Sequence, residues 1–219
     1  MNSSRNEDLK FKRRRMALVD ELREKGIRYE NVLAAFDNVP RHIFVDSALA
    51  DKAYQDTALP IEMGQTISQP YTVARQTELL NVRSGDKILE IGTGSGYQCA
   101  ILCEMGAKVF SIERHRELYE RSRILMRKLN YRPTLKADDG SLGWSAYAPY
   151  QSIVVTAGAP AMPENLIKQL EVGGCLIVPV GDAKQQVMHR ITRIGEDEYE
   201  DEHFSNFKFV PLIGERGWK

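Results

Sequence analysis

The chain has 219 residues, of which 42% are hydrophobic and 27% are charged, with thirty basic and thirty acidic side chains. This composition is ordinary for a globular protein, and the length suffices for one compact unit with a full core. The balanced charge gives no global attraction to nucleic acid or anionic membrane, and no segment approaches the roughly 18 apolar residues of a membrane span. Because Met1 to Lys12 also lacks the apolar core of a secretion signal, we expect a cytoplasmic protein, monomeric by default.

Residues 1–80 predict an N-terminal helical segment. From Asp8 onward, apolar residues at helical spacing predict one helix that ends before Gly26 and a second that ends before Pro40, with core positions Leu18, Val19, Leu22, Val32, Leu33 and Phe36. Four hydrogen-bonding side chains then lie between Gly64 and Pro70, ahead of a further predicted helix over Thr72 to Leu80. Such a loop can cover a ligand, although Ser68 also suits the N-cap of that helix.

Residues 81–219 alternate strands with helices, which predicts a doubly wound, mostly parallel sheet of the Rossmann-like kind. The predicted strands are Ile88–Ile91, Val109–Ile112, Thr134–Ala137, Ile153–Thr156 and Leu176–Val180, and the helices between them are Tyr97–Met105, Arg116–Leu129 and Glu164–Leu170. At the end of the chain, Val187–Ile194 and Phe204–Val210 predict an antiparallel edge hairpin around an acidic turn, Glu196–Glu202. The fold class is therefore α/β, with a helical appendage and an edge hairpin.

A glycine-rich turn follows the first strand of this sheet. Gly92, Gly94 and Gly96 allow a tight turn and a close approach of backbone to a ligand. The next strand ends in Glu113, whose carboxylate can accept both ribose hydroxyls of an adenosine. Together these residues predict an adenosine site at the carboxyl ends of the strands, with an ordinary strand-to-helix turn as the alternative.

The turn favours one adenosine cofactor over others. Tyr97 stands where a dinucleotide-binding loop needs its third glycine, and no Gly-Lys-Ser/Thr ending is present to hold phosphates. Glu90, just before the turn, would repel a pyrophosphate but suits a ligand with cationic groups. S-adenosylmethionine carries an ammonium and a sulfonium, so we expect it as the cofactor and S-adenosylhomocysteine as the product.

Other polar residues have both a candidate functional role and a simpler structural one. Asp139 and Gly140 end the third strand, where a carboxylate and backbone amides suit an adenine edge, although Asp-Gly is also a common turn pair. The odd number of cysteines, Cys99, Cys103 and Cys175, favours reduced, buried thiols. The four histidines share no ligand spacing, so we expect packing or surface roles for them and no metal site.

The chain resembles the protein-L-isoaspartate(D-aspartate) O-methyltransferase family from about Val39 to its end. The resemblance rests most specifically on Gln65-Thr66-Ile67-Ser68-Gln69-Pro70 and the tail Val210-Pro211-Leu212, together with the glycine turn, Asp139-Gly140 and Gly173-Gly174. It implies a class I S-adenosylmethionine-dependent methyltransferase fold. It also implies that Ser68 is the active-site residue and that cofactor contacts come from Thr66, Ile67, Gln69, Glu90, Glu113, Asp139 and Gly140. Gln151 departs from the family's usual Asp, which puts local capping of the fourth strand in doubt.

The activity that the resemblance implies is methylation of the free α-carboxylate of L-isoaspartyl residues in damaged proteins and peptides. Attack of the next backbone nitrogen on the methyl ester would give a succinimide, whose hydrolysis returns some normal aspartyl bonds. Because that carboxylate has a pKa near 3.5, it is already ionised and needs no general base. Ser68 would then position the carboxylate, and a peptide groove should lie between the loops Gln65–Tyr71 and Ala157–Pro163.

Rival functions come from three classes. A methyltransferase of RNA or of a small metabolite would use the same cofactor half, but it should add a basic, aromatic face or an Asn-Pro-Pro-Tyr motif where this chain has Thr156-Ala157-Gly158-Ala159-Pro160. A nicotinamide oxidoreductase is disfavoured by Tyr97. A non-catalytic binding module has no need of the two cofactor carboxylates, Glu90 and Glu113.

Overall fold

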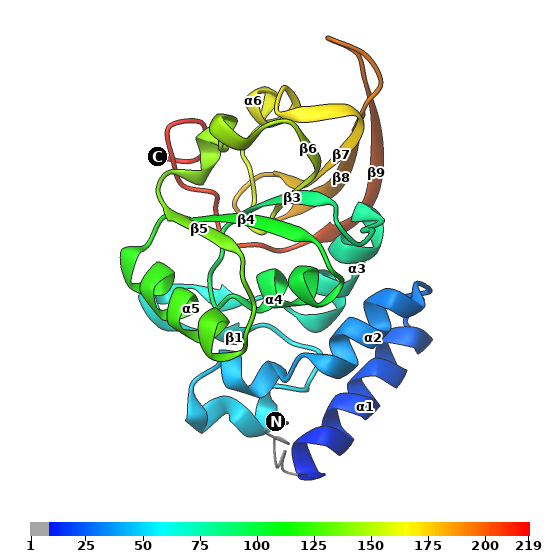
Figure 1. Cartoon of the computed structure of the whole chain (residues 1–219), viewed down its shortest axis with the longest axis vertical. Coiled ribbons are helices and arrows are strands. Elements are labelled where there is room, and N and C mark those ends of the chain that lie inside the picture. The colour runs from blue at the N-terminus through cyan, green and yellow to red at the C-terminus, as the bar shows by residue number, and fades with distance from the viewer. Residues whose placement is uncertain (1–8) are drawn as a thin grey trace.

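A computed structural model describes residues 9–219 as a central sheet with helices on both faces (Figure 1). The seven strands, in spatial order, are β5 (Thr134–Ala137), β4 (Lys108–Glu113), β3 (Lys87–Ile91), β6 (Tyr150–Val155), β7 (Leu170–Gly181), β8 (Gln186–Arg193) and β9 (Tyr199–Phe207). Pairing is parallel from β5 to β7 and antiparallel from β7 to β9. The predicted fold class is confirmed. Residues 1–8, which include the predicted helical start at Asp8, lie outside the described residues.

The helices are α1 (Leu9–Glu24), α2 (Glu30–Asn38), α3 (Pro70–Leu80), α4 (Tyr97–Glu104), α5 (Arg116–Lys128) and α6 (Glu164–Ile167). Their packing follows the alternation of side chains along β3. Ile88 faces a large cluster that also contains apolar residues of α1 to α4, whereas Leu89 and Ile91 face a second cluster that contains Leu166 and Ile167 of α6. The N-terminal helices therefore share a core with one face of the sheet. No helix among residues 9–219 has the length and apolar character needed to cross a membrane.

A small antiparallel pair, β1 (Leu59–Pro60) and β2 (Thr66–Ile67), holds the loop that precedes α3. Single 3-10 turns occur at Arg41–Phe44, Ser47–Lys52, Glu62–Gly64, Gly140–Leu142 and Ser145–Tyr147. In Figure 1, β1 lies below the sheet, beside α5 and to the left of α2. The covering loop is thus held at both ends by regular structure.

Three predicted boundaries are wrong. The acidic residues Glu200, Asp201 and Glu202 lie within β9 and not in the hairpin turn, because an exposed edge strand leaves carboxylates in water, and Glu202 also pairs with Arg190 across the strands. The same strand ends at Phe207, and not at Val210. The predicted helix Glu164–Leu170 stops at Ile167, because Leu170 already pairs with Tyr150 as the start of β7.

Gln151 lies at the start of β6 and joins three strands. Its side-chain oxygen accepts a hydrogen bond from the Lys87 amide (2.7 Å), and its amide nitrogen donates to Glu171 (2.6 Å). The residue is at the end of the sheet opposite to the carboxyl ends of β3 and β4. Its effect is therefore local, at the amino-terminal edge of the parallel strands.

Candidate functional site

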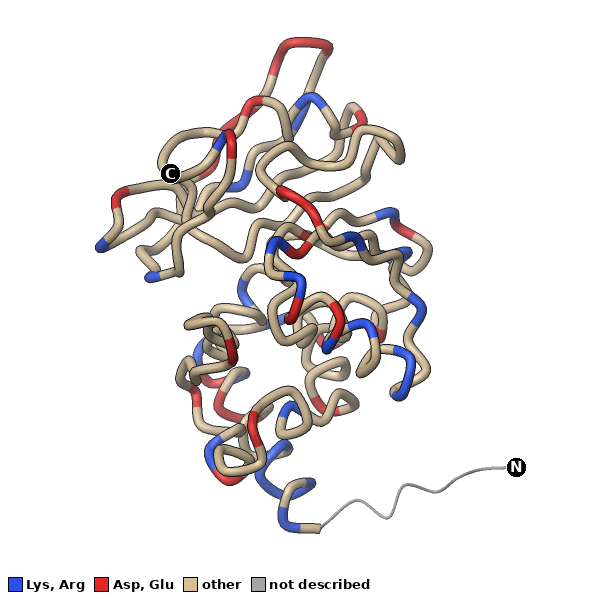
Figure 2. The backbone as a smooth tube through the Cα atoms, turned by 90° about the vertical axis from the view of Figure 1, so that its left-hand side faces the viewer, with Lys and Arg blue, Asp and Glu red and all other residues tan. Residues whose placement is uncertain are grey.

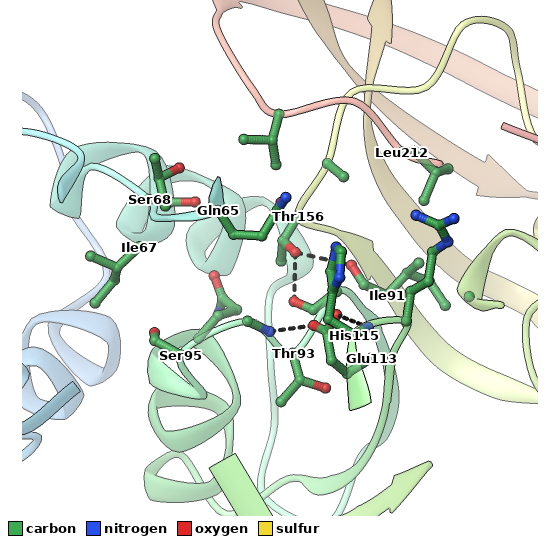
Figure 3. Close-up of a pocket in the computed structure, with 18 of the residues that line it drawn as sticks. Gln65, Ile67, Ser68, Ile91, Thr93, Ser95, Glu113, His115, Thr156 and Leu212 are labelled. Carbon is green, nitrogen blue, oxygen red and sulfur yellow. Dashed lines mark hydrogen bonds between the residues drawn. The ribbon is translucent and has the colours of Figure 1, made fainter. Parts of the chain in front are cut away.

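A pocket opens at the carboxyl ends of β3, β4 and β6 (Figure 3). Its walls come from segments far apart in the sequence: the loop around β2, the glycine turn, the end of β4, the turn after β5, the end of β6 and the C-terminal tail. The pocket is lined by polar and apolar residues that include Gln65, Thr66, Ile67, Ser68, Gln76, Gly92, Gly94, Gln98, Glu113, His115, Gly140, Thr156, Val210, Pro211, Leu212 and Ile213. This is the edge at which doubly wound sheets bind their ligands.

The glycine turn adopts backbone conformations that suit glycine. Gly92 has φ 93° and Gly96 has φ 87°. At Gly92 a side chain is excluded sterically as well, since a Cβ would lie 2.5 Å from Thr156 Oγ1. The Thr156 hydroxyl in turn lies 2.7 Å from the Gly92 carbonyl oxygen and ties the turn to the end of β6. Gly92 and Gly94 line the pocket as predicted, whereas Gly96 is the N-cap residue of α4 and faces Met126.

Glu113 occupies the position expected for a ribose-binding carboxylate. Its side chain lines the pocket, and its two oxygens accept hydrogen bonds from the amides of Gly94 (2.7 Å) and His115 (2.8 Å) (Figure 3). These bonds fix the carboxylate, and each oxygen keeps a further lone pair for a ligand donor. The prediction of Glu113 at the end of β4, facing the glycine turn, is matched by this geometry.

Glu90 is placed differently from Glu113. It is fully buried beneath the glycine turn and is absent from the residues that line the pocket. The Ser111 hydroxyl donates to its Oε2 (2.5 Å), while Oε1 has no hydrogen-bond partner among the described residues. Burial raises the pKa of Glu90 to about 8, so its side chain is protonated in most molecules at neutral pH. Its predicted repulsion of a pyrophosphate is therefore weak.

Asp139 and Gly140 have separate roles in the structure. Gly140 lines the pocket and packs so closely that a Cβ would lie 2.6 Å from Ile91 Cγ2. Asp139 lies outside the pocket lining, where its carboxylate accepts hydrogen bonds from the amides of Ser141 (2.9 Å) and Glu215 (2.7 Å). Burial opposes ionisation, but these amide bonds outweigh it and lower the pKa of Asp139. Its carboxylate therefore anchors the C-terminal tail beside the pocket.

The Ser68 loop forms the wall opposite to Glu113 (Figure 3). Helix α3 begins at Pro70 with Gln69 as its N-cap residue and no side-chain capping bond, so the alternative role of Ser68 as a helix cap is wrong. Gln69 instead donates to Asp56 (3.0 Å), and the Tyr71 amide donates to the other oxygen of the same carboxylate (2.7 Å). With Asp56 organising the helix start, the Ser68 hydroxyl is left without a partner among the described residues and lines the pocket.

A second groove adjoins the pocket at Ser68. Thr66, Ser68 and Thr156 line both the pocket and the groove, whereas Gln69 lines the groove but not the pocket. The opposite wall consists of Ser205 to Val210 with Lys184 and Gln185. None of the predicted wall residues Ala157–Pro163 lines this groove, where the end of β9 and the chain after it form the wall instead, and Ala157 lines the pocket. The place where a peptide binds stays a prediction.

Sequence reasoning missed several residues of the pocket. Val210 to Ile213 cover it from the tail, and His115 and Thr156 line it beside Glu113. We expected packing or surface roles for the four histidines, whereas His115, two residues after Glu113, lines the pocket. The family-specific tail was the signal available for Val210 to Leu212, although nothing in its spacing shows that it folds back. Of the predicted thiols, Cys99 and Cys175 are buried and Cys103 is half-buried, all free.

Comparison with known proteins identifies relatives of the whole chain. The family model described as protein-L-isoaspartate(D-aspartate) O-methyltransferase matches residues 13–217. A protein-L-isoaspartate O-methyltransferase of Cytophaga hutchinsonii is 53% identical over 93% of this chain and 92% of its own length. Another, from Salinibacter ruber, is 50% identical over 98% of both chains.

Solved structures agree with this assignment. One protein-L-isoaspartate O-methyltransferase superposes with a TM-score of 0.84 at 27% identity, over 93% of this chain and 67% of that one. A second, from Plasmodium falciparum in complex with S-adenosyl-L-homocysteine, has a TM-score of 0.79 at 24% identity, over 90% of this chain and 97% of that one. The second likeness is evidence for the fold.

Proposed function

The chain belongs to the protein-L-isoaspartate(D-aspartate) O-methyltransferase family, and we propose that its pocket and groove carry out the family's reaction on isoaspartyl proteins and peptides. The enzyme is an S-adenosylmethionine-dependent protein carboxyl methyltransferase, which starts repair of isomerised aspartates. The observation that carries the proposal is the placement of Ser68 and Glu113 on opposite walls of one pocket, with a groove that opens beside Ser68.

The pocket residues fit S-adenosylmethionine. The Glu113 carboxylate, fixed by two backbone amides, suits the ribose hydroxyls, and Gly140, where Ile91 excludes a side chain, presents bare backbone to the pocket, which suits the edge of a flat base. Gln98 lines the pocket and its Oε1 is buried without a donor among the described residues, which suits the ammonium of the methionyl part. Thr66, Ile67 and the glycine turn would complete the contacts with the cofactor. Glu90 and Asp139, which do not line the pocket, would support the residues that do. When bound, the group supplies an electrophilic methyl on a sulfonium.

The chain's own residues supply orientation and exclusion of water. We propose that the free hydroxyl of Ser68 donates to the α-carboxylate of the isoaspartyl residue and directs one oxygen into the pocket. Because that carboxylate is already ionised near neutral pH, the site needs no general base. Such orientation, together with closure by Val210 to Ile213, is the type of effect that can be worth roughly 7 to 11 kcal/mol.

The groove beside Ser68 suits an extended peptide. Its wall from Ser205 to Val210 continues directly from β9, and Lys184 and Lys208 add positive charge along it. In an isoaspartyl residue the methylene lies in the main chain, so the free α-carboxylate is bonded directly to the backbone Cα and not through a side-chain methylene. We propose that the groove holds the flanking, longer backbone while this carboxylate reaches Ser68.

Transfer of labelled methyl from S-adenosylmethionine to three acceptors tests this function: an isoaspartyl hexapeptide, total RNA and a mixture of small carboxylic acids. We expect label in the peptide. Label in RNA or in the small acids alone would favour the rival methyltransferases, and protection against unfolding by NADH rather than by S-adenosylmethionine would favour an oxidoreductase. The cytoplasmic location, the monomeric state and the lack of a nucleic-acid partner stay predictions, of which light scattering tests the second.

A further inference from the structure

The β8–β9 hairpin brings three potential metal ligands together on one face. His189 of β8 lies directly opposite His203 of β9, and Asp201 shares the face of His203 because it is two residues away on the same strand. The three ligand atoms all lie within 4.8 Å of one another. This cluster is not visible in the sequence, since Asp201 lies twelve positions after His189 and strand pairing alone makes them neighbours.

The distances between these side chains are close to those of a metal site. His189 Nδ1 lies 2.9 Å from Asp201 Oδ1, and His203 Nε2 lies 3.1 Å from Asp201 Oδ2. Bonds of about 2.0 to 2.2 Å from zinc to nitrogen or oxygen place neighbouring ligands of a tetrahedral ion roughly 3.3 Å apart. The two imidazoles need to approach each other, and their ring centroids are already 4.3 Å apart.

The two histidine side chains differ in their exposure to solvent, and this difference allows the two imidazoles to approach each other. The His189 side chain is 13% exposed on the inner strand of the hairpin, whereas the His203 side chain is 60% exposed, so apart from its contact with Asp201 little packing opposes a rotation toward His189. Asp201 is 29% exposed, so solvent molecules can complete the coordination of an ion. The arrangement gives a more buried ligand, a central carboxylate and an adjustable ligand.

The charge along β9 also favours a cation. Glu200 and Glu202 flank Asp201, and three more carboxylates, Glu196, Asp197 and Glu198, form the hairpin tip at the top of the molecule in Figure 2. The flanking carboxylates raise the local concentration of cations, whereas salt screens the tip, which lies several residues further along the strands. Two imidazoles with one carboxylate are donors that suit Zn²⁺, Ni²⁺ and Cu²⁺ better than Mg²⁺ or Ca²⁺.

We propose that His189, Asp201 and His203 bind one divalent transition-metal ion, with Zn²⁺ as the representative ligand. The ion would join the edge strand β9 to β8. Because β9 leads into the groove wall Ser205–Val210 and the tail over the pocket, the ion would stabilise the strand pair from which both walls start.

Calorimetric titration of the chelator-treated, tag-free full chain with ZnCl₂ tests the site. We expect one saturable ion per chain, and affinity weaker by roughly tenfold or more in His203→Gln and Asp201→Asn. Glu200→Gln, an exposed substitution on the same strand but the opposite face, is the matched control and should bind as the wild type does.

Titration with Co²⁺ separates these ligands from the thiols, because coordination by imidazole and carboxylate produces no thiolate charge-transfer band. Either of two results would overturn the proposal: no saturable Zn²⁺ binding by the wild-type chain, or unchanged affinity in His203→Gln. A thiolate band with Co²⁺ would also overturn it, by assigning the ion to cysteine.

Discussion

The buried guanidinium of Arg41 donates a hydrogen bond from Nη2 to the carbonyl oxygen of Ser68 (2.8 Å). Its Nε donates to the Ala53 carbonyl (2.8 Å), and its Cζ lies 4.8 Å from the ring centroid of Tyr97, the first residue of α4. Burial lowers the pKa of Arg41 to about 10, so the group stays charged at neutral pH. One cation thereby connects the Ser68 loop to the helix that follows the glycine turn.

This connection predicts that Arg41 positions Ser68. Arg41→Lys keeps the charge but cannot present two N–H groups in a fixed plane to both carbonyls. We expect kcat/KM for an isoaspartyl peptide to fall by roughly tenfold or more, while the Kd for S-adenosylmethionine changes far less. Steady-state kinetics and calorimetry measure the two quantities. Equal loss of cofactor and peptide affinity would instead indicate a general packing role.

Ser68 has a prediction of its own. Because its hydroxyl caps no helix, Ser68→Ala should change the free energy of unfolding by less than about 0.5 kcal/mol, as for a surface substitution. Both Ser68→Ala and Ser68→Asp should lose methyl transfer, and Asp should be the worse enzyme because it repels the substrate carboxylate. Urea unfolding and methyl transfer are the measurements. An Asp variant with near-normal turnover would remove Ser68 from the active site.

We predict that Glu113 contributes to the affinity for the cofactor. Glu113→Ala should weaken S-adenosylmethionine binding by about 1.5 to 3 kcal/mol, the loss expected for hydrogen bonds to a charged group. Glu113→Gln, which retains one acceptor oxygen, should lose less. Calorimetry measures both affinities, and circular dichroism checks that the fold survives loss of the bonds from Gly94 and His115. Unchanged affinity in the Ala variant would place the ribose contact elsewhere.

Glu90 predicts a pH dependence of stability. Its folded-state pKa of about 8 lies above the ordinary value of 4.5, so the folded chain keeps a proton that the unfolded chain releases. The free energy of unfolding should therefore fall as pH rises from about 4.5 to about 8, and level off once the folded group ionises. Urea unfolding across this range measures the slope without cofactor.

Glu90→Gln should flatten that slope, because the amide has no proton to release while it still accepts the bond from Ser111. The exposed Glu62→Gln is the control and should keep the slope of the wild type. A Glu90→Gln variant with the full pH dependence would show that another group titrates.

The sequence predicted the sheet and the cofactor end of the site because both depend on local signals. Glycines followed by a strand that ends in Glu113 specify the turn, the strand and the carboxylate within 22 residues (92–113). The complete burial of Glu90 could not be predicted from such local signals. Alternation along β3 places it on the face of Ile88, but which helices cover that face depends on contacts with the distant N-terminal half.

The path of the tail and the extent of β9 in the edge hairpin were not predicted, for a related reason. Residues 199–202 have the composition of a turn, yet strand pairing with β8 overrides that local preference. The path of Val210 to Ile213 over the pocket depends on long-range bonds, such as that from the Gly158 amide to the Val210 carbonyl (2.8 Å). A hydrogen bond between residues so far apart in the chain cannot be predicted from the residues next to either partner.

Comparison of two matched peptides tests the central claim most directly: kcat/KM for methyl transfer to a hexapeptide with one L-isoaspartyl residue, and to the same hexapeptide with normal L-aspartate. The account predicts transfer to the isoaspartyl peptide at saturable rates and no transfer above background to the aspartyl peptide. Equal kcat/KM for the two would contradict it, because the groove would then not distinguish a carboxylate bonded directly to the main chain from one at the end of an ordinary side chain.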